Sequence, residues 1–103
     1  MLFFGTAAYQ LKEGGQTIGR KDPQSEANIQ IATGDATLQI MHAQLKVVTL
    51  NDGSYKYIVT PYSHDTSVFV NQLLLEEDDE VMLNIGEELR LGDTVLLLKP
   101  STK

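Results

Sequence analysis

Cysteine is missing from this sequence. Its absence excludes disulfide scaffolds, thiolate catalysis and zinc sites with cysteine ligands, and it favours an intracellular protein, so we expect a cytoplasmic location. Long apolar runs are missing as well, because no stretch approaches the roughly 20 residues of a bilayer-spanning helix. The opening Met-Leu-Phe-Phe is too short for a signal-peptide core and follows no basic segment. We therefore expect no membrane partner.

Positive charge is scarce. The chain has 8 Lys and Arg residues against 14 Asp and Glu residues, which gives a formal net charge of -6 at pH 7. Binding to nucleic acids or anionic membranes depends on cations that neutralise phosphate groups, so this balance argues against both kinds of partner. The 2 histidines and the scattered acids lack the spacing of zinc ligands, and the run Glu76–Glu80 lacks the glycine and alternation of a calcium loop. We expect no metal and no cofactor.

Sustained helical periodicity is also absent. Short apolar or alternating runs are instead broken by turn residues about every 8 to 12 positions, which is typical of a β-sandwich or barrel. A chain of 103 residues with 42% hydrophobic content is large enough to bury one core. We therefore predict a single all-β domain over residues 1–103, a sandwich of about 10 or 11 short strands. We expect this domain to be a module of a longer chain.

The clearest predicted element is a hairpin. From His42 onwards, apolar and polar residues alternate, as in a strand with one buried face. Asn51–Ser54 is the strongest turn signal, because Asp-Gly tolerates the positive φ of tight hairpins, and Tyr55–Thr60 is the partner strand. The pair Gly14–Gly15 predicts another hairpin turn. The remaining strands are expected at residues 8–12, 16–19, 29–31, 67–70, 73–75, 81–83, 88–91 and 94–99.

A candidate anion site lies in Thr17–Lys21, where an alternating strand gives way to the polar loop Asp22–Glu26. Arg20 follows a glycine there. A guanidinium group suits phosphate because its planar fork donates two parallel hydrogen bonds and stays charged near neutral pH. Lys21 can add a second positive charge. The alternative interpretation is a turn glycine beside a solvated arginine and lysine.

Several short motifs occur in an order that matches one family. In chain order they are Ile18–Arg20, Ile29–Ile31, His42–Ala43, Phe69–Asn71 and Glu88–Thr94, followed by a final apolar strand. This arrangement resembles the forkhead-associated (FHA) domain, and the likeness covers about residues 8–99. The resemblance implies an FHA-like, SMAD-like β-sandwich that binds phosphothreonine-containing peptides through loops at one end.

The resemblance also implies roles for individual residues. In the family, the arginine of the Gly-Arg pair contacts the phosphate, so Arg20 takes that role here. The family's phosphate-binding serine is replaced by Gln39, whose longer side chain can still donate from its amide, and the basic residue after it is replaced by Ile40. Thr37 and Gln39 are candidate pocket donors, with ordinary loop capping as the alternative. His42 is expected to brace the Gly-Arg loop without touching the ligand.

A second loop departs from the family pattern. Thr66 stands where the family has the asparagine that grips the ligand backbone, and Asp65 stands where a serine or threonine assists the phosphate. An aspartate at that position repels a phosphate dianion unless an arginine screens it. Asn71 does match the family at a later turn. We expect it to support the site structurally, together with Gly19 and His42.

Catalysis is not expected. Ser63, His64 and Asp65 supply the letters of a hydrolase triad, but three consecutive residues cannot readily form a nucleophile–base–orienter chain. The first hypothesis is therefore a non-enzymatic module that binds a phosphothreonine-containing protein or peptide. The second is the same fold with a degenerate pocket that binds an unphosphorylated protein partner. If the strands alternate, Glu76–Glu80 returns to the Arg20 end and favours basic residues around the phosphothreonine.

Overall fold

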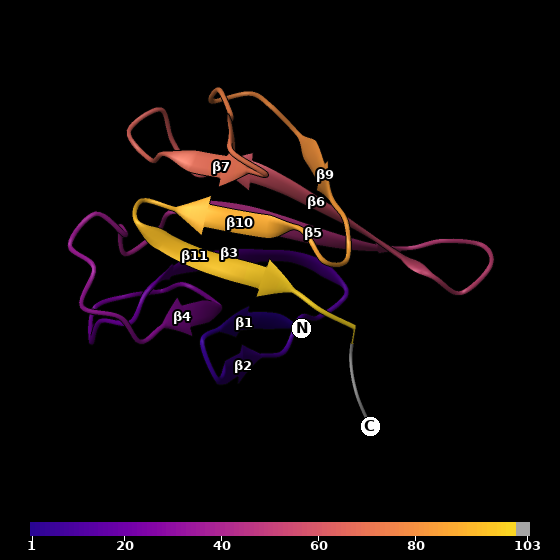
Figure 1. The fold of residues 1–103 in the computed structure, drawn as a ribbon, viewed down its shortest axis with the longest axis horizontal. Helices are drawn as coiled ribbons and strands as arrows, with labels where there is room; N and C mark the ends of the chain where they lie inside the picture. The colour runs from indigo at the N-terminus through magenta and orange to yellow at the C-terminus, as the bar shows by residue number, and fades with distance from the viewer. Residues whose placement is uncertain (101–103) are drawn as a thin grey trace.

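The computed structural model describes residues 1–100, and this range contains β-strands and no helix. No helix capable of crossing a membrane is therefore found among the described residues. One sheet has six strands in the order β2 (Ala7–Tyr9), β1 (Leu2–Phe4), β11 (Thr94–Leu98), β10 (Glu88–Leu91), β7 (Val68–Val70) and β8 (Leu73–Leu74). The other has five, in the order β4 (Ile29–Ile31), β3 (Gly14–Arg20), β5 (Ala43–Thr49), β6 (Tyr55–Pro61) and β9 (Val81–Leu83). The two sheets pack as a sandwich (Figure 1), which confirms the predicted all-β fold.

The core lies between the two sheets and is filled from alternate positions of their strands. On β5, the side chains of Ala43, Leu45 and Val47 are buried, whereas Gln44 and Lys46 are exposed. This alternation gives the sheet one face for the core and one for solvent. Both sheets contribute to the fully buried apolar side chains, which include Leu2, Ile18, Ile31, Val59, Val68, Leu89, Leu91, Leu96 and Leu98.

The hairpin formed by β5 and β6 has the predicted pairing and turn. Its register runs from Ala43 opposite Pro61 to Thr49 opposite Tyr55. In the turn, Gly53 has a φ of 87°, which a residue without a β-carbon adopts without strain. The prediction of this hairpin from alternation and Asp-Gly is confirmed.

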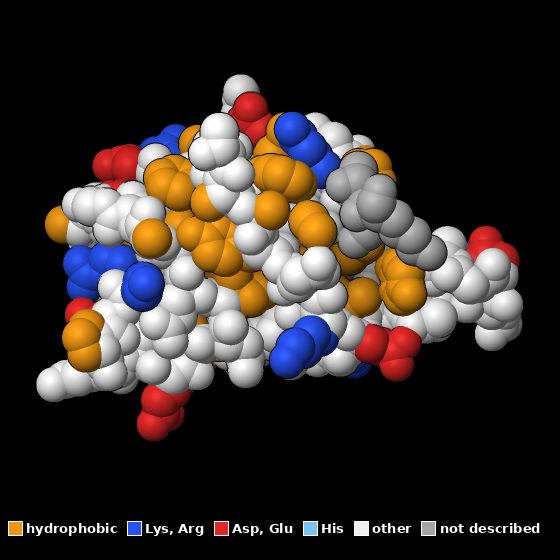
Figure 2. All heavy atoms as spheres, turned by 90° about the horizontal axis from the view of Figure 1, so that it is seen from below, with side chains coloured by type: hydrophobic (Ala, Val, Ile, Leu, Met, Phe, Trp, Pro, Cys, Tyr) orange, Lys and Arg blue, Asp and Glu red, His pale blue; other side chains and the backbone are white. Residues whose placement is uncertain are grey.

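The N-terminal residues form a strand that the sequence did not predict. Residues 2–4 make up β1, which pairs with β2 on one side and with β11 on the other. Leu2 is completely buried, and Phe4 and Tyr9 pack against the core from this edge. Figure 2 shows hydrophobic side chains gathered on the side of the molecule where β1 and β2 lie. Burial against β11 therefore holds a segment that is too short to be recognised locally.

Gly14 and Gly15 do not form the predicted hairpin turn. They are the first residues of β3, where they pair with Val47 and Lys46. The chain instead passes from one sheet to the other in the link between β2 and β3. There the Gln16 side chain accepts a 3.0 Å hydrogen bond from the backbone N–H of Lys12 and donates one of 2.7 Å to its carbonyl oxygen. Pairing with β5 thus overrides the local preference of two glycines for a turn.

Several connecting loops meet at one end of the sandwich, on the left of Figure 1. The link from β4 to β5 contacts the end of β3, because Arg20 donates its backbone N–H to the carbonyl oxygen of Gln39 at 2.9 Å. The β6–β7 loop contacts the β10–β11 turn, because Gly92 donates its backbone N–H to the carbonyl oxygen of Ser67 at 3.1 Å. This end of the molecule carries the Gly-Arg motif.

Candidate functional site

Gly19 lies directly beneath the loop that connects β4 to β5. A β-carbon added at Gly19 would lie 1.7 Å from the carbonyl oxygen of Ile40 and 2.4 Å from its carbonyl carbon. Backbone atoms cannot yield as a flexible side chain does, so only glycine permits this close approach. The glycine of the Gly-Arg motif is therefore required by packing, and it seats the loop on the end of β3 beside Arg20.

Arg20 lines an open pocket at this end of the sandwich. The pocket has a volume of about 320 Å³. Its lining residues are Arg20, Gln39, Ile40, Met41, Tyr62, Ser63, Asp65 and Thr66. The Nε atom of Arg20 is buried and has no hydrogen-bond partner among the described residues. An unpaired buried donor is costly, and more so when it is charged, so this guanidinium group is suited to an anionic ligand.

His42 joins two of the loops around the pocket. Its Nδ1 atom accepts a hydrogen bond from the backbone N–H of Gln39 at 3.0 Å. The ring proton therefore belongs on Nε2, which donates to the carbonyl oxygen of Ser67 at 2.7 Å. Burial lowers the pKa of His42 below its usual 6.5, although the Ser67 carbonyl and the charge of Asp35 act in the opposite direction. A neutral imidazole thus bridges the β4–β5 and β6–β7 loops.

Asp35 fastens the β4–β5 loop to the β10–β11 turn. Its Oδ1 atom accepts from the hydroxyl and the backbone N–H of Thr37 at 2.6 and 2.9 Å. Its Oδ2 atom accepts from the Thr94 hydroxyl at 2.6 Å and from the backbone N–H of Asp93 at 3.0 Å. The hydrogen bonds from the Thr37 and Thr94 side chains are the main reason why the pKa of Asp35 falls to about 2. The Thr37 hydroxyl also accepts a hydrogen bond from the Asp93 N–H at 2.8 Å. The hydroxyl therefore both donates and accepts within this network.

In a short turn of the β6–β7 loop, the hydroxyl of Thr66 is already occupied by hydrogen bonds within the loop. That hydroxyl donates to the carbonyl oxygen of Ser63 at 2.9 Å and accepts from the Ser63 backbone N–H at 3.2 Å. The Ser63 hydroxyl in turn accepts from the backbone N–H of Asp65 at 3.3 Å. Asp65 is exposed and lies 3.2 Å from His64. These bonds hold the loop in shape. None of these bonds among the described residues joins the Ser63 hydroxyl to the His64 ring, as a nucleophile and its base would require.

The pocket brings together several of the residues that the sequence singled out, namely Arg20, Gln39, Asp65 and Thr66. Lys21 is exposed and does not line the pocket, and Thr37 lies outside it in the Asp35 network. Sequence reasoning missed Tyr62, Ile40 and Met41 as lining residues. Tyr62 carried a usable signal, since it is an aromatic residue in a polar loop directly after a strand, and 45% of it is exposed.

Asn71 lies at the opposite end of β7 from the pocket loop. Asn71 and Gln72 have φ angles of 49° and 71°, and they form the turn between β7 and β8. Asn71 donates its backbone N–H to the carbonyl oxygen of Glu88 at 3.1 Å, and its side-chain amide contacts the carboxylate of Glu87. It therefore holds the β7–β8 turn against the start of β10 and does not touch the pocket.

The acidic run Glu76–Glu80 returns towards the pocket end, as the strand alternation predicted. It links β8 to β9, and the carbonyl oxygen of Asp79 accepts a 2.9 Å hydrogen bond from the hydroxyl of Thr60. Thr60 lies two positions before Tyr62, which lines the pocket. The run therefore lies beside the end of β6 that leads into the pocket loop, and none of its residues is among those that line the pocket.

The motifs from β3 to the β10–β11 turn fall within one known family. The model for the FHA domain matches residues 16–92. The chain belongs to the FHA domain family. FHA domains are known as phosphothreonine-dependent protein-interaction modules. Among curated proteins, none matches the sequence.

Solved FHA domains share this fold at low sequence identity. The FHA domain of the CT664 protein from Chlamydia trachomatis is 23% identical, with a TM-score of 0.71 over 98% of this chain and 94% of that one. The MEK1 FHA domain in complex with a HOP1 phosphothreonine peptide is 19% identical, with a TM-score of 0.73 over 93% and 90%. A domain studied for phosphothreonine-dependent FHA interactions is 21% identical, with a TM-score of 0.71 over 99% and 94%. Likeness at this level of identity establishes the fold of the FHA domain, and the site has to be argued from its own residues.

Proposed function

We propose that this FHA domain is a non-enzymatic module that binds a phosphothreonine-containing protein by placing the phosphate against Arg20. The observation that carries the proposal is that Arg20 lines the pocket while its buried Nε atom has no hydrogen-bond partner among the described residues. A phosphate oxygen would accept a charge-assisted hydrogen bond from the part of the guanidinium group that the pocket exposes, and the planar fork would allow a second. The remaining donors of a phosphate cradle would come from the Gln39 amide and from exposed backbone N–H groups.

The other pocket residues modulate this binding. Asp65 adds a negative charge to the lining and opposes a dianion, so the phosphate is expected to sit on the Arg20 side of the pocket. Lys21 adds positive charge from outside the pocket. Ile40, Met41 and Tyr62 offer apolar surface that suits the threonine methyl group or a neighbouring apolar side chain.

A second candidate function is phosphate-independent binding of a protein partner by the same loops. Two observations favour it: the Thr66 hydroxyl is already committed to Ser63, and the Asp65 carboxylate lines the pocket. Both features lower the number of donors available to a phosphate. Whether binding needs the phosphate and the Arg20 side chain distinguishes the two functions.

The decisive experiment is an NMR titration of the ¹⁵N-labelled domain with a degenerate phosphothreonine peptide pool and its unphosphorylated twin. We expect phosphate-dependent shifts at residues 20, 39–42 and 62–66, and expect them to be lost in Arg20→Ala. Lys56→Ala is the matched control, because it removes one cation from β6 near the opposite hairpin end and should leave the shifts unchanged. Equal shifts with both pools would support the phosphate-independent function and reject the first.

A further inference from the structure

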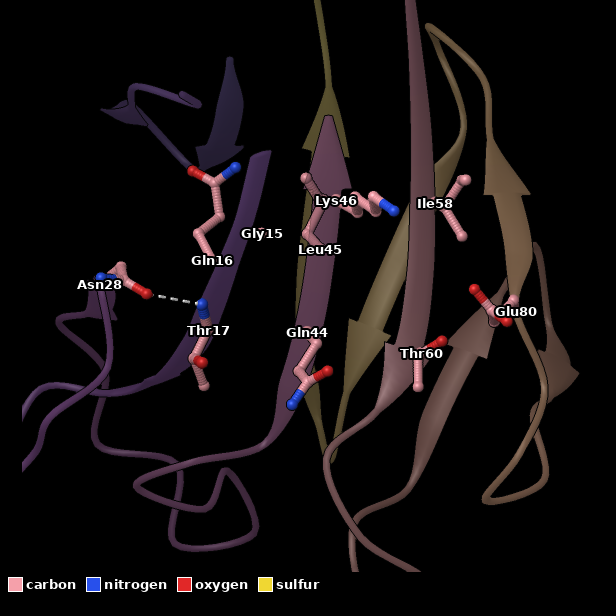
Figure 3. A pocket seen from close by; sticks show the side chains of 10 residues that line it. All are labelled: Gly15, Gln16, Thr17, Asn28, Gln44, Leu45, Lys46, Ile58, Thr60 and Glu80. Atoms are coloured by element: carbon pink, nitrogen blue, oxygen red, sulfur yellow. Dashed lines mark hydrogen bonds between the residues drawn. The ribbon is translucent and has the colours of Figure 1, made fainter. Parts of the chain in front are cut away.

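A second hollow lies on the solvent face of the five-stranded sheet. It has a volume of about 320 Å³ and crosses β3, β5 and β6. Thr17, Gln44 and Thr60 form a cross-strand row along it, as the strand registers require and as Figure 3 shows. The next row contains Gly15, which has no side chain and so leaves the floor of the groove open on β3.

The lining of this groove is polar and nearly balanced in charge. Hydroxyl and amide side chains predominate, with Lys46 and Glu80 as single opposite charges and Ile58 as an apolar contact. Asn28 uses its side-chain oxygen to accept the backbone N–H of Thr17 at 2.9 Å, which leaves its amide N–H groups for another acceptor. Groups of this kind both donate and accept, so they suit the backbone and the uncharged polar side chains of an extended peptide.

The groove ends beside the Arg20 pocket, where β6 leads into the pocket loop. Thr60 lines the groove, and Tyr62, two positions further along the chain, lines the pocket. At about 3.3 Å per residue, this separation is roughly 7 Å. An extended chain leaving the pocket would reach the groove within a few residues.

We propose that the groove is a second subsite for the phosphothreonine-containing partner, which lays an extended segment with uncharged hydrogen-bonding side chains across β3, β5 and β6. This inference rests on the proposed function, since the phosphothreonine at Arg20 anchors the segment. The spacing places the subsite roughly three to six residues from the phosphothreonine in an extended chain. Its occupant is the flanking sequence of the same partner chain, because Thr60 and Tyr62 place the groove next to the pocket.

The test compares two degenerate phosphothreonine pools that differ only in length. The short pool carries about two residues on each side of the phosphothreonine and ends before the groove, whereas the long pool carries about eight and spans it. We expect the long pool to bind roughly fivefold more tightly, as one or two added hydrogen bonds would give. In NMR spectra, the long pool alone should shift the amides of Gln44, Lys46, Ile58 and Thr60.

A variant whose larger side chain fills the groove provides a second test of the subsite. Gln44→Trp should reduce the affinity for the long pool to that for the short pool and leave short-pool binding unchanged, which also shows that the variant is folded. Val95→Trp is the matched control, because Val95 is exposed on β11 of the other sheet and should preserve the gain. Equal binding of both pools to the unaltered domain would overturn the groove subsite while the phosphothreonine function stands. Failure of both pools to bind would overturn both.

Discussion

The carbonyl oxygen of Ile40 lies against Gly19 with no space for a β-carbon between them. This contact couples the end of β3 to the loop that carries Gln39, and Arg20 lies beside it. The glycine of the Gly-Arg motif is thus a packing requirement, and the arginine is the side chain that this packing positions. Changes at the glycine should therefore affect both stability and binding.

Gly19→Ala should destabilise the domain and disrupt the pocket. The added β-carbon cannot fit without moving the Ile40 backbone, and overpacking of this kind costs about 1 to 3 kcal/mol, or more where backbone must shift. We expect a loss of at least about 2 kcal/mol in urea unfolding. Gly34→Ala is the control, because a β-carbon at Gly34 meets nothing within 4 Å. Equal stability of the two variants would contradict the packing argument.

His42 should make the stability of the domain depend on pH. Its pKa is lowered in the folded state, so between the folded value and about 6.5 the unfolded chain binds more protons. The stabilisation is complete above about pH 6.5 and is lost as pH falls towards the folded pKa, with a slope of at most about 1.4 kcal/mol per pH unit. Urea unfolding from about pH 5 to 7.5 should show this decline.

Two histidine variants separate this effect from other titrations. His42→Gln should remove the decline and also lower stability at neutral pH, because the backbone N–H of Gln39 and the carbonyl of Ser67 lose their bridging imidazole. His64→Gln should retain the decline, since His64 is an exposed loop residue. A decline that persists unchanged in the His42 variant would assign the pH dependence to other groups.

The sequence was sufficient for the fold where structure depends on local pattern. The alternation after His42 and the Asp-Gly turn predicted β5 and β6 correctly, because side-chain period and turn chemistry act between neighbours. It was insufficient for β1, where Leu2 is held by pairing with Leu98 at the other end of the chain. No local pattern encodes that contact, and for the same reason Gly14–Gly15 was assigned to a turn that β5 pairing prevents.

The candidate site shows the same division. The Gly-Arg motif identified Arg20 because its chemistry can be read from adjacent residues. The sequence could not show that the Thr37 hydroxyl is occupied by a hydrogen bond from Asp93, because Asp93 is 56 positions away and meets it only in the folded domain. Tyr62 enters the pocket through the path of a loop, whereas Asn71, which we expected to support the site, lies at the other end of β7. These outcomes depend on loop geometry, which sequence motifs leave open.

Asp35→Asn should loosen the β4–β5 loop and change the acid response. The carboxylate accepts hydrogen bonds from Thr37, Asp93 and Thr94, and the folded pKa of about 2 lies below the ordinary value of 3.8. The carboxylate therefore stabilises the fold above about pH 3.8, and this contribution is lost as pH falls towards 2. The variant should unfold at lower temperature at neutral pH and lose less stability on acidification.

Asp52→Asn is the matched control for that change. Asp52 also accepts from the hydroxyl and backbone N–H of a nearby residue, Ser54, but it lies in the β5–β6 turn. NMR spectra of the Asp35 variant should show shifted amides at Gln39 and His42, whereas those of the Asp52 variant should not. Unshifted pocket amides in the Asp35 variant would separate this network from the pocket.

The acidic run should set a preference for basic residues around the phosphothreonine. Glu76, Glu77 and Asp78 are exposed and belong to a loop that approaches Thr60 near the pocket. Charges about 10 Å apart interact weakly in salt, so we expect phosphothreonine pools with arginine in the flanks to bind roughly two- to fourfold more tightly than pools with glutamate. Isothermal titration at low salt measures this ratio.

Neutralising the run tests the origin of that preference. The triple variant Glu76→Gln, Glu77→Gln, Asp78→Asn should bring the ratio close to one, and raising the salt from about 0.05 M to about 0.5 M should do the same in the unaltered domain. Asp79 is left in place because its carboxylate holds the turn by accepting the backbone N–H of Glu76 at 2.8 Å. Glu88→Gln, which removes an exposed acid from β10, should preserve the ratio. A preference that survives both the triple variant and high salt would have to come from direct contacts in the pocket, with Asp65 as the first residue to change.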